Sequence, residues 1–314
     1  MDSRILPNWK SEDTAAFGQK TLLMQHTLSE TGLFDRDVLA ELIETVPAHA
    51  YNLNTMGWDH TNPEWREGRL PKISGHEAIE AIARGRMWLN MRKLQSWSPR
   101  HAQLLERMYD EFEKLIPGFS TFRQSLGLLI SSPNVQVFYH ADIPGQSLWQ
   151  LEGKKRVYIY PNQEPFLPQK SLEGIILGET EEEIDYQPGF DDKAEVFDLE
   201  PGQALNWALN GPHRVENADC LNISVTTEHW TSDIRKSYAV HYANGVLRRR
   251  LGLDNLSPSI ETPLVYPKAA LAAFWRKLEL NSGDKVQRVT DFELDPTADK
   301  GIRDVEQRPK ETAG

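Results

Sequence analysis

Eight short segments between residues 125 and 229 are rich in β-branched and aromatic residues and are separated by turn-forming sequences. They cover residues 126–131, 135–140, 147–152, 155–160, 195–199, 204–208, 212–217 and 221–228. A block of short strands is typical of sandwiches and barrels, whereas an alternating βα sheet would place a helix after each strand. The pattern therefore predicts a mainly β protein with a jelly-roll core made of two sheets.

Amphipathic helical patterns flank this block on both sides. They predict helices before the block at 34–46, 75–94 and 98–116, and after it at 234–251 and 268–280. Ser98 followed by Pro99 is the arrangement of a helix cap with proline at the first helical position. Residues 51–72 are rich in turn formers and tryptophan, so we expect a loop there.

These patterns predict four regions along the chain. A helical region at 1–120 packs on a core at 121–230, which contains an acidic insert at 161–193. The helices in 231–281 cover the core or form a homodimer contact. Residues 282–314 are charged and sparse in apolar residues, so we expect a flexible tail.

The net charge of −11 comes almost entirely from one segment. Residues 161–200 contain twelve acidic residues and two basic residues, which accounts for −10. An acidic chain is not expected to bind nucleic acid or an anionic membrane surface, because both attract basic proteins. Within this segment, the acidic run Glu179–Asp185 is either a solvated loop or a border of the open end of the jelly roll. In the second case, we expect a substrate with a positive or basic group and a turnover that falls as salt rises.

The cysteine content and the apolar segments restrict the compartment. Cys220 is the single cysteine, which excludes an internal disulfide and Cys-rich metal sites. The first twenty residues contain no apolar signal-peptide core, and no stretch approaches the roughly 20 apolar residues of a membrane span. We therefore expect a soluble, cytoplasmic protein with no membrane segment.

The candidate site begins where one predicted strand ends. Side chains alternate along a strand, so His140 and Asp142 lie on one face and can present an imidazole and a carboxylate to one ion. With His213, they would complete the two-histidine, one-carboxylate triad of non-haem Fe(II) oxygenases. About one His-x-acid pair is expected by chance from nine histidines and 46 acids. A partly buried histidine beside a solvated aspartate is therefore the alternative.

Four sequence segments around these residues carry a family resemblance. They occur in the order Ser132–Asp142, Leu148–Pro161, Leu199–Gly202 and Gly211–Asn217. Together they resemble the jumonji-type (JmjC-like) cupin family, in particular its bacterial members and its asparaginyl hydroxylase branch. The core of the resemblance covers residues 120–230, and similar segments at His26–Phe34 and Tyr242–Gly252 extend it over most of the chain.

The resemblance implies an Fe(II)- and 2-oxoglutarate-dependent oxygenase with a double-stranded β-helix core flanked by N- and C-terminal helices. It implies that His140, Asp142 and His213 ligate Fe(II), and that Lys155 binds the distal carboxylate of 2-oxoglutarate. A buried carboxylate needs a charge partner, which an ammonium group supplies. Lys154 is the alternative, although strand alternation places only one of the two lysines inside. The implied reaction consumes O2, releases succinate and carbon dioxide, and hydroxylates a substrate C–H bond.

Five further residues occupy positions that matter in this family. Thr226, with Ser224 one pleat earlier, stands where a polar residue often supports the co-substrate. Val137 replaces a hydroxyl residue that is common three positions before the first histidine, which removes one hydrogen bond to 2-oxoglutarate. Gln146 stands where an asparagine or an acid is more usual, and Trp149 either packs in the core or forms a wall of the pocket. Val137, Gln146 and Trp149 are therefore the candidate substrate-pocket residues.

The sequence does not name the substrate, which could be a protein side chain, an amino acid or another small metabolite. Two other functions remain open at this point. One is a metal-dependent cupin that does not use 2-oxoglutarate. The other is a non-catalytic sensor or interaction protein that retains the fold.

Overall fold

The computed structural model describes residues 4–56, 65–180, 184–278 and 289–309. The described residues contain two sheets, and the smaller one has the strand order β6 (Gln136–His140), β11 (His213–Asn217), β8 (Lys155–Ile159) and β9 (Glu195–Leu199). The larger sheet contains the other four strands of the predicted block. These are β5 (Phe122–Ser131), β7 (Gly145–Glu152), β10 (Gln203–Asn206) and β12 (Asn222–Trp230). All eight predicted strands are therefore present, and the predicted jelly-roll core is confirmed.

The N-terminal region, predicted as helical at 1–120, contains helices but also adds strands to the larger sheet, which the prediction missed. The added strands are β1 (Leu22–Gln25), β2 (Tyr51–Thr55), β3 (Arg66–Arg69) and β4 (Met87–Met91). In the full sheet the order is β1-β10-β7-β12-β5-β4-β2-β3-β13-β14. Two of these strands lie in the predicted loop at 51–72, and β4 lies in the predicted helix at 75–94.

The helix predicted at 75–94 is shorter than expected because a glycine ends it. Ser74 caps α3 (Gly75–Arg84), with Glu77 completing a reciprocal capping box. A Cβ on Gly85 would lie 2.3 Å from the Met87 side chain, so the chain turns tightly there into β4. Along β4, Met87, Leu89 and Met91 share the face that belongs to the main core. This two-residue alternation is a strand pattern.

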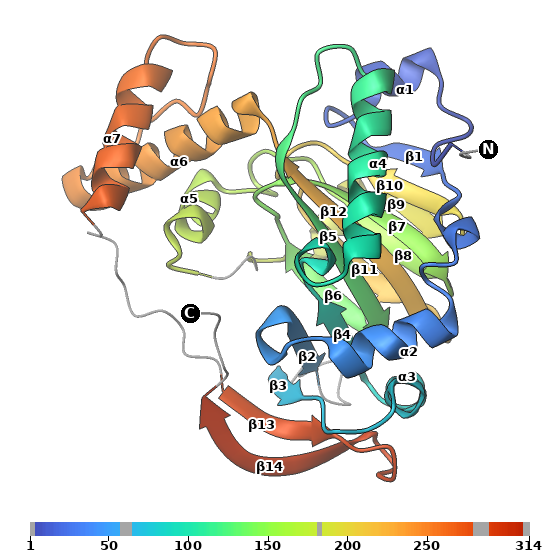
Figure 1. The fold of residues 1–314 in the computed structure, drawn as a ribbon. Helices are drawn as coiled ribbons and strands as arrows, with labels where there is room; N and C mark the ends of the chain where they lie inside the picture. The colour runs from blue at the N-terminus through green and yellow to red at the C-terminus, as the bar shows by residue number, and fades with distance from the viewer. Residues whose placement is uncertain (1–3, 57–64, 181–183, 279–288, 310–314) are drawn as a thin grey trace.

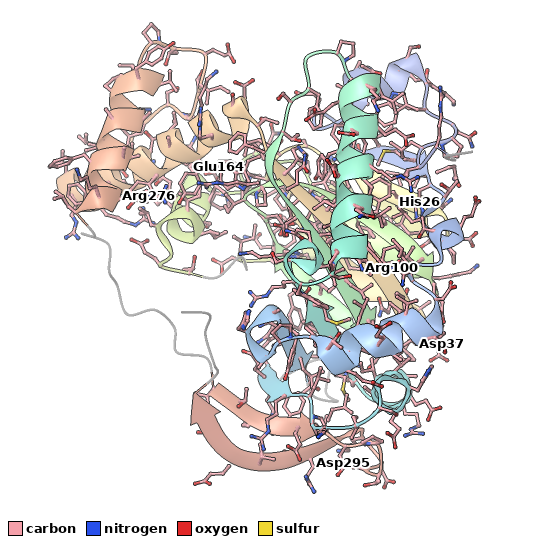
Figure 2. The ribbon with its side chains drawn as sticks, in the orientation of Figure 1. His26, Asp37, Arg100, Glu164, Arg276 and Asp295 are labelled. Carbon is pink, nitrogen blue, oxygen red and sulfur yellow. The ribbon has the colours of Figure 1, made fainter. Side chains whose placement is uncertain are left out.

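The C-terminal segment predicted as a flexible tail contains a β-hairpin. Strand β13 (Val289–Leu294) pairs with β14 (Ile302–Pro309) and, in parallel, with β3. Phe292 is fully buried against Gly68, where an added Cβ would lie 2.3 Å from the phenyl ring. Asp295 lies at the end of this hairpin (Figure 2). Its carboxylate accepts hydrogen bonds from the backbone N–H and the hydroxyl of Thr297. Residues 282–288 and 310–314 of the predicted tail lie outside the described residues.

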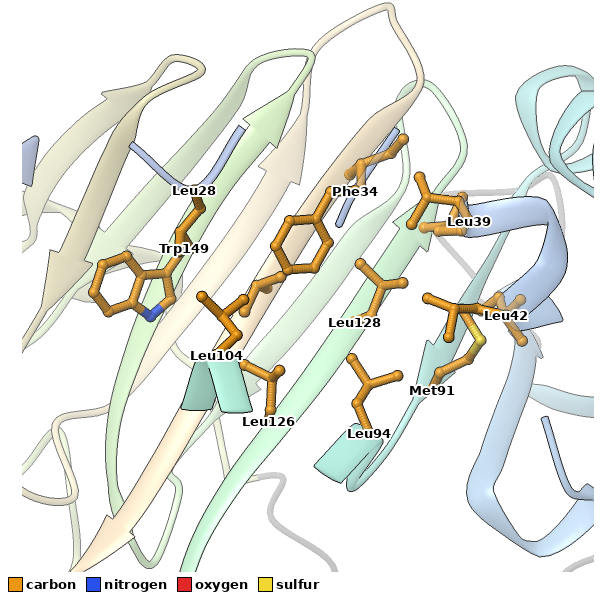
Figure 3. Close-up of a cluster of buried hydrophobic side chains, with 14 of the residues drawn as sticks. Leu28, Phe34, Leu39, Leu42, Met91, Leu94, Leu104, Leu126, Leu128 and Trp149 are labelled. Carbon is orange, nitrogen blue, oxygen red and sulfur yellow. The ribbon is translucent and has the colours of Figure 1, made fainter. Parts of the chain in front are cut away.

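The main hydrophobic core lies on one face of the larger sheet. Helices α2 (Arg36–Thr45) and α4 (Pro99–Leu115) pack on this face, and Figure 3 shows side chains from the strands and helices meeting there. The members include Leu39, Leu42, Leu104, Leu126, Leu128 and Trp149. Each leucine buried in this way contributes about 1.5–3 kcal/mol of hydrophobic stabilisation. The core therefore holds the sheet rigid while leaving its other face for the site.

The C-terminal helices α6 (Ser232–Leu251) and α7 (Val265–Lys277) lie to one side of the larger sheet, together with α5 (Gln169–Leu177) of the acidic insert (Figure 1). Glu173 of α5 is fully buried and pairs with Arg248 of α6 at 2.9 Å. Tyr266 and Phe274 of α7 are exposed. The homodimer contact through these helices stays a prediction. Within the described residues, no helix is both long enough and apolar enough for a membrane span.

Candidate metal centre

The backbone pairing of β6 and β11 brings the predicted metal ligands together. His140 ends β6 and His213 begins β11, and the two residues are direct partners in the antiparallel register. Asp142 follows His140 by two residues, just beyond the end of the strand. One ligand atom from each of the three residues lies within 4.8 Å of the others. The structure thus assembles the group that sequence spacing predicts.

Backbone carbonyls fix the orientation of both imidazoles. Nδ1 of His140 lies 2.7 Å from the carbonyl oxygen of Phe138, and Nδ1 of His213 lies 3.0 Å from that of Gly211. A carbonyl can only accept, so each Nδ1 carries the proton and donates it. In the neutral imidazole, a proton on Nδ1 leaves the lone pair of Nε2 available, which is the usual arrangement of metal-binding histidines.

The loop that carries Asp142 is held by Asn210. Nδ2 of Asn210 donates to the carbonyl oxygen of Asp142 at 2.6 Å and is 3.3 Å from that of Ile143. Asn210 adopts a left-handed backbone conformation with a φ of 57°, which asparagine tolerates better than most residues. This contact links the segment after β6 to the segment before β11.

Burial shapes the charge of the three candidate ligands. It raises the pKa of Asp142 to about 6, although nearby His140 partly opposes this shift. Burial also holds the pKa of His213 well below its usual value, so its imidazole is neutral. Oδ2 of Asp142 is buried without a hydrogen-bond partner among the described residues and lies 3.3 Å from Nε2 of His213.

This donor set fits a divalent metal ion. An unsatisfied buried carboxylate oxygen is costly, and a bound cation would remove that cost. Two neutral imidazoles and one carboxylate are the ligands of the Fe(II) facial triad, which leaves coordination positions open for other molecules. The residues present could therefore hold Fe(II).

A cavity of about 660 Å3 opens from the three candidate ligands. Among the other predicted site residues, Val137, Gln146 and Thr226 line it. Trp207 also lines the cavity, and its ring centroid lies 4.5 Å from that of His213. The cavity therefore connects the three candidate metal ligands with Val137, Gln146 and Thr226.

Trp149 lies away from this cavity, so its prediction as a pocket wall is wrong. Its indole is fully buried in the main core on the other face of β7, and its Nε1 donates to the Thr227 hydroxyl at 2.9 Å. Leu148, the neighbouring residue, faces the cavity instead. The alternation of side chains along a strand places only one of these two residues on each face.

Ser224 and Lys155 lie inside the barrel but do not line the cavity. The hydroxyl of Ser224 donates to Oε1 of Gln150 at 2.7 Å. Lys155 shares the inward face of β8 with Val157 and Ile159, the residue paired with His213. Four residues of strand place Lys155 about 13 Å from Ile159. Burial lowers the pKa of Lys155 from 10.5 to about 7.

Sequence reasoning missed a polar part of the cavity that the N-terminal strands supply. Asn52 and Asn54 of β2 line it, as do Trp88 and Asn90 of β4. The sequences of β2 and β4 alternate these residues with core residues, and that period-two pattern was the signal available. Glu228 of β12 also lines the cavity close to the metal group.

The acidic insert contributes little to the cavity. Within the described part of 161–193, Ile175 and Thr180 line it, and neither is charged. Several acids of residues 161–200 form ion pairs with basic residues elsewhere in the chain: Glu173 with Arg248, Glu179 with Arg249, Asp191 with Arg214, Asp198 with Arg156, and Glu200 with Lys154. This arrangement gives no support to the predicted basic substrate, which stays a prediction.

Comparison with known proteins gives similarity in structure only. No protein-family model and no curated protein matches the chain. A structure of YcfD from Escherichia coli is similar, with 18% identity, a TM-score of 0.51, and coverage of 91% of this chain and 70% of that one. A second structure, of the ribosomal oxygenase YcfD in complex with cobalt and 2-oxoglutarate, gives 15% identity, a TM-score of 0.51, and coverage of 90% and 69%. The likeness supports the predicted fold.

Proposed function

We propose that this chain is an Fe(II)- and 2-oxoglutarate-dependent oxygenase that hydroxylates a C–H bond of its substrate. The observation that carries the proposal is the convergence of His140, Asp142 and His213 within 4.8 Å at one end of a cavity. The fold likeness to YcfD, whose own structure is described as a complex with cobalt and 2-oxoglutarate, is consistent with it.

His140, Asp142 and His213 would hold the Fe(II). When bound with 2-oxoglutarate and O2, this ion supplies the oxidising chemistry that converts the co-substrate to succinate and carbon dioxide. The chain orients both imidazoles through their Nδ1 hydrogen bonds, and burial keeps the His213 imidazole neutral. It also provides a single carboxylate, so the donor set offsets part of the charge of a divalent ion.

Lys155 is the residue proposed to hold the distal carboxylate of 2-oxoglutarate. It is buried on the barrel interior and has no ion-pair partner among the described residues, unlike Lys154, which pairs with Glu200 on the surface. A buried ammonium without a counter-charge is disfavoured, and a bound carboxylate would stabilise it. Thr226, which lines the cavity, is proposed as a second residue that forms a hydrogen bond with 2-oxoglutarate.

Apolar side chains around the metal group would limit access of water. Leu148 and Val215 line the cavity with Trp207, and all three belong to one apolar cluster of the barrel interior. Such a wall strengthens electrostatic contacts and restricts side reactions. Val137, where the family commonly has a hydroxyl residue, adds to this apolar surface.

A metal-dependent cupin that does not use 2-oxoglutarate is the second candidate, because Lys155 does not line the cavity. The two functions are separated by succinate. We expect the purified chain with Fe(II), O2 and 2-oxoglutarate to release succinate, detectable by NMR spectroscopy, and the Lys155→Met variant to release much less. Absence of succinate release would favour the second candidate, whereas equal release by the two proteins would show that 2-oxoglutarate is used without Lys155.

A further inference from the structure

One face of the N-terminal part of the larger sheet is polar, buried and open to the cavity. Asn90 of β4 is directly paired with Asn52 of β2, and Trp88 is directly paired with Asn54. All four residues line the cavity. Residues on the opposite face of the same strands, such as Leu53 and Leu89, belong to the main hydrophobic core. Hydrophobic packing of the sheet takes place on that opposite face, so it does not explain the polar residues on the cavity side.

Asn54 has an unmet hydrogen-bonding requirement. Its side chain is 2% exposed, and no described residue accepts a hydrogen bond from its Nδ2. Its neighbour Asn52 differs in this respect, because Nδ2 of Asn52 donates to the carboxylate of Glu67 at 2.9 Å. A buried donor without an acceptor costs about 1–3 kcal/mol, so the fold alone gives no reason for an asparagine here.

A glycine keeps this polar face connected to the metal end of the cavity. Gly127 of β5 pairs with Thr226 and lines the cavity between β12 and β4. A Cβ at this position would lie 2.5 Å from the Thr226 hydroxyl and 3.9 Å from Oδ1 of Asn90. Three strand spacings separate β12 from β2, which corresponds to about 14 Å. A ligand that reaches both ends would therefore be extended.

The charges around this face favour an uncharged group. Trp88 is buried, the residues of β2 and β4 that line the cavity carry no charge, and the buried carboxylate of Glu67, hydrogen-bonded to Asn52, would repel an anion. Arg92 and Lys93 line the cavity next to this face and would repel a cation. A neutral group that accepts a hydrogen bond satisfies Asn54 and can pack against the Trp88 indole.

We propose that the cavity wall formed by Asn54, Asn90 and Trp88 is a substrate subsite that binds a neutral carbonyl-bearing group, remote from the carbon that reacts. The inference deepens the proposed function, since it treats the metal end of the same cavity as the place of reaction. Asn54 donates to the carbonyl oxygen, Asn90 offers a second hydrogen bond, and Trp88 packs against the attached carbon skeleton.

Three probes of one shape and different charge test this subsite: benzamide is neutral, benzoate is an anion and benzamidine is a cation. Binding to the full chain without added metal is measured by ligand-observed NMR spectroscopy, so failure of the oxygenase proposal does not affect the result. We expect benzamide to bind at least tenfold more tightly than either ion. Tightest binding of benzamidine or benzoate, or no binding of benzamide, would overturn the proposal.

Variants of the subsite separate recognition from folding. Asn54→Leu has a similar volume and removes the unpartnered donor, so we expect at least tenfold weaker benzamide binding with a Tm no lower than that of the unchanged chain. Asn90→Ala, at a less buried position, should also weaken binding, whereas Asn255→Ala, at an exposed position, should not. A lower Tm of Asn54→Leu, or unchanged benzamide binding in both subsite variants, would assign these residues a structural role.

Discussion

His140 and His213 face each other across the antiparallel pair of β6 and β11, with ring centroids 4.1 Å apart. The His213 imidazole, kept neutral by burial, also lies beside the buried carboxylate of Asp142, so the three side chains present their ligand atoms as one group. We therefore expect His213→Ala to lower Fe(II) affinity by at least roughly 100-fold, measured by anaerobic titration. His49→Ala, which removes an exposed histidine, is the control and should bind Fe(II) normally.

The position of Lys155 predicts a pH-dependent affinity for 2-oxoglutarate. Its pKa is lowered to about 7 by burial, so at higher pH the free protein must first take up a proton before the ammonium can pair with a carboxylate. We expect affinity to fall as pH rises above about 7, and to fall at least tenfold in Lys155→Met. The control is Lys154→Ala, which removes the exposed ion pair with Glu200 and should leave the affinity for 2-oxoglutarate unchanged. Equal affinities for Lys155→Met and the unchanged chain would remove Lys155 from the co-substrate site.

The same burial predicts how stability depends on pH. The folded-state pKa of Lys155 is lowered from 10.5 to about 7, so between these values the unfolded chain binds more protons than the folded chain. The contribution of Lys155 to the free energy of unfolding therefore rises with pH across this window. Lys155→Met should unfold at a higher urea concentration near pH 7, with the difference shrinking toward pH 10.5. A lower urea midpoint for the variant near pH 7 would contradict this assignment.

The buried pair of Glu173 and Arg248 joins the acidic insert to α6. The side chain of Glu173 is 0% exposed, so Glu173→Ala leaves the Arg248 guanidinium without its buried partner. We expect the free energy of unfolding to fall by about 3–5 kcal/mol in urea denaturation. Asp233→Ala breaks the exposed pair with Lys236 and should cost less than about 0.5 kcal/mol. Similar losses in the two variants would mean that Glu173 is solvated.

The packing of Phe292 on Gly68 makes the C-terminal hairpin part of the folded unit. Phe292 is fully buried, so Phe292→Ala should lower the free energy of unfolding by about 3–5 kcal/mol. Gly68→Ala should also destabilise the chain, because the added methyl group meets the phenyl ring. Val289→Ala, at an exposed position of the same strand, should have little effect. A loss below about 1 kcal/mol for Phe292→Ala would restore the interpretation of this segment as a loosely attached tail.

The predictable part of the fold is the part where local sequence and tertiary context agree. The core strands are short, apolar and bounded by turns such as Glu200-Pro-Gly, so each appears near its predicted position. The spacing of His140 and Asp142 fixes their shared face, and the antiparallel return of β11 brings His213 beside them. Both signals depend on a period of two residues, which the sequence displays directly.

The rest depends on contacts that the sequence does not display. The hairpin is charged, and part of its attachment comes from ion pairs with distant residues, such as Arg66 with Asp291. A run rich in acids and bases is typical of a tail when these partners are unknown. Trp149 faces the core and its neighbour Leu148 faces the cavity, because successive side chains of a strand point to opposite faces. The burial of Glu173 could not be inferred either, because its partner Arg248 is 75 residues away along the chain.

The proposed Fe(II) site can be tested by anaerobic titration with Fe(II) and 2-oxoglutarate, followed by visible absorption. We expect uptake of a single Fe(II) per chain at His140, Asp142 and His213, and an absorption band that appears only when 2-oxoglutarate is also present. The band should be lost in His213→Ala and retained in His49→Ala. If the chain takes up no Fe(II), or if His213→Ala binds Fe(II) equally well, these three residues do not form an Fe(II) site.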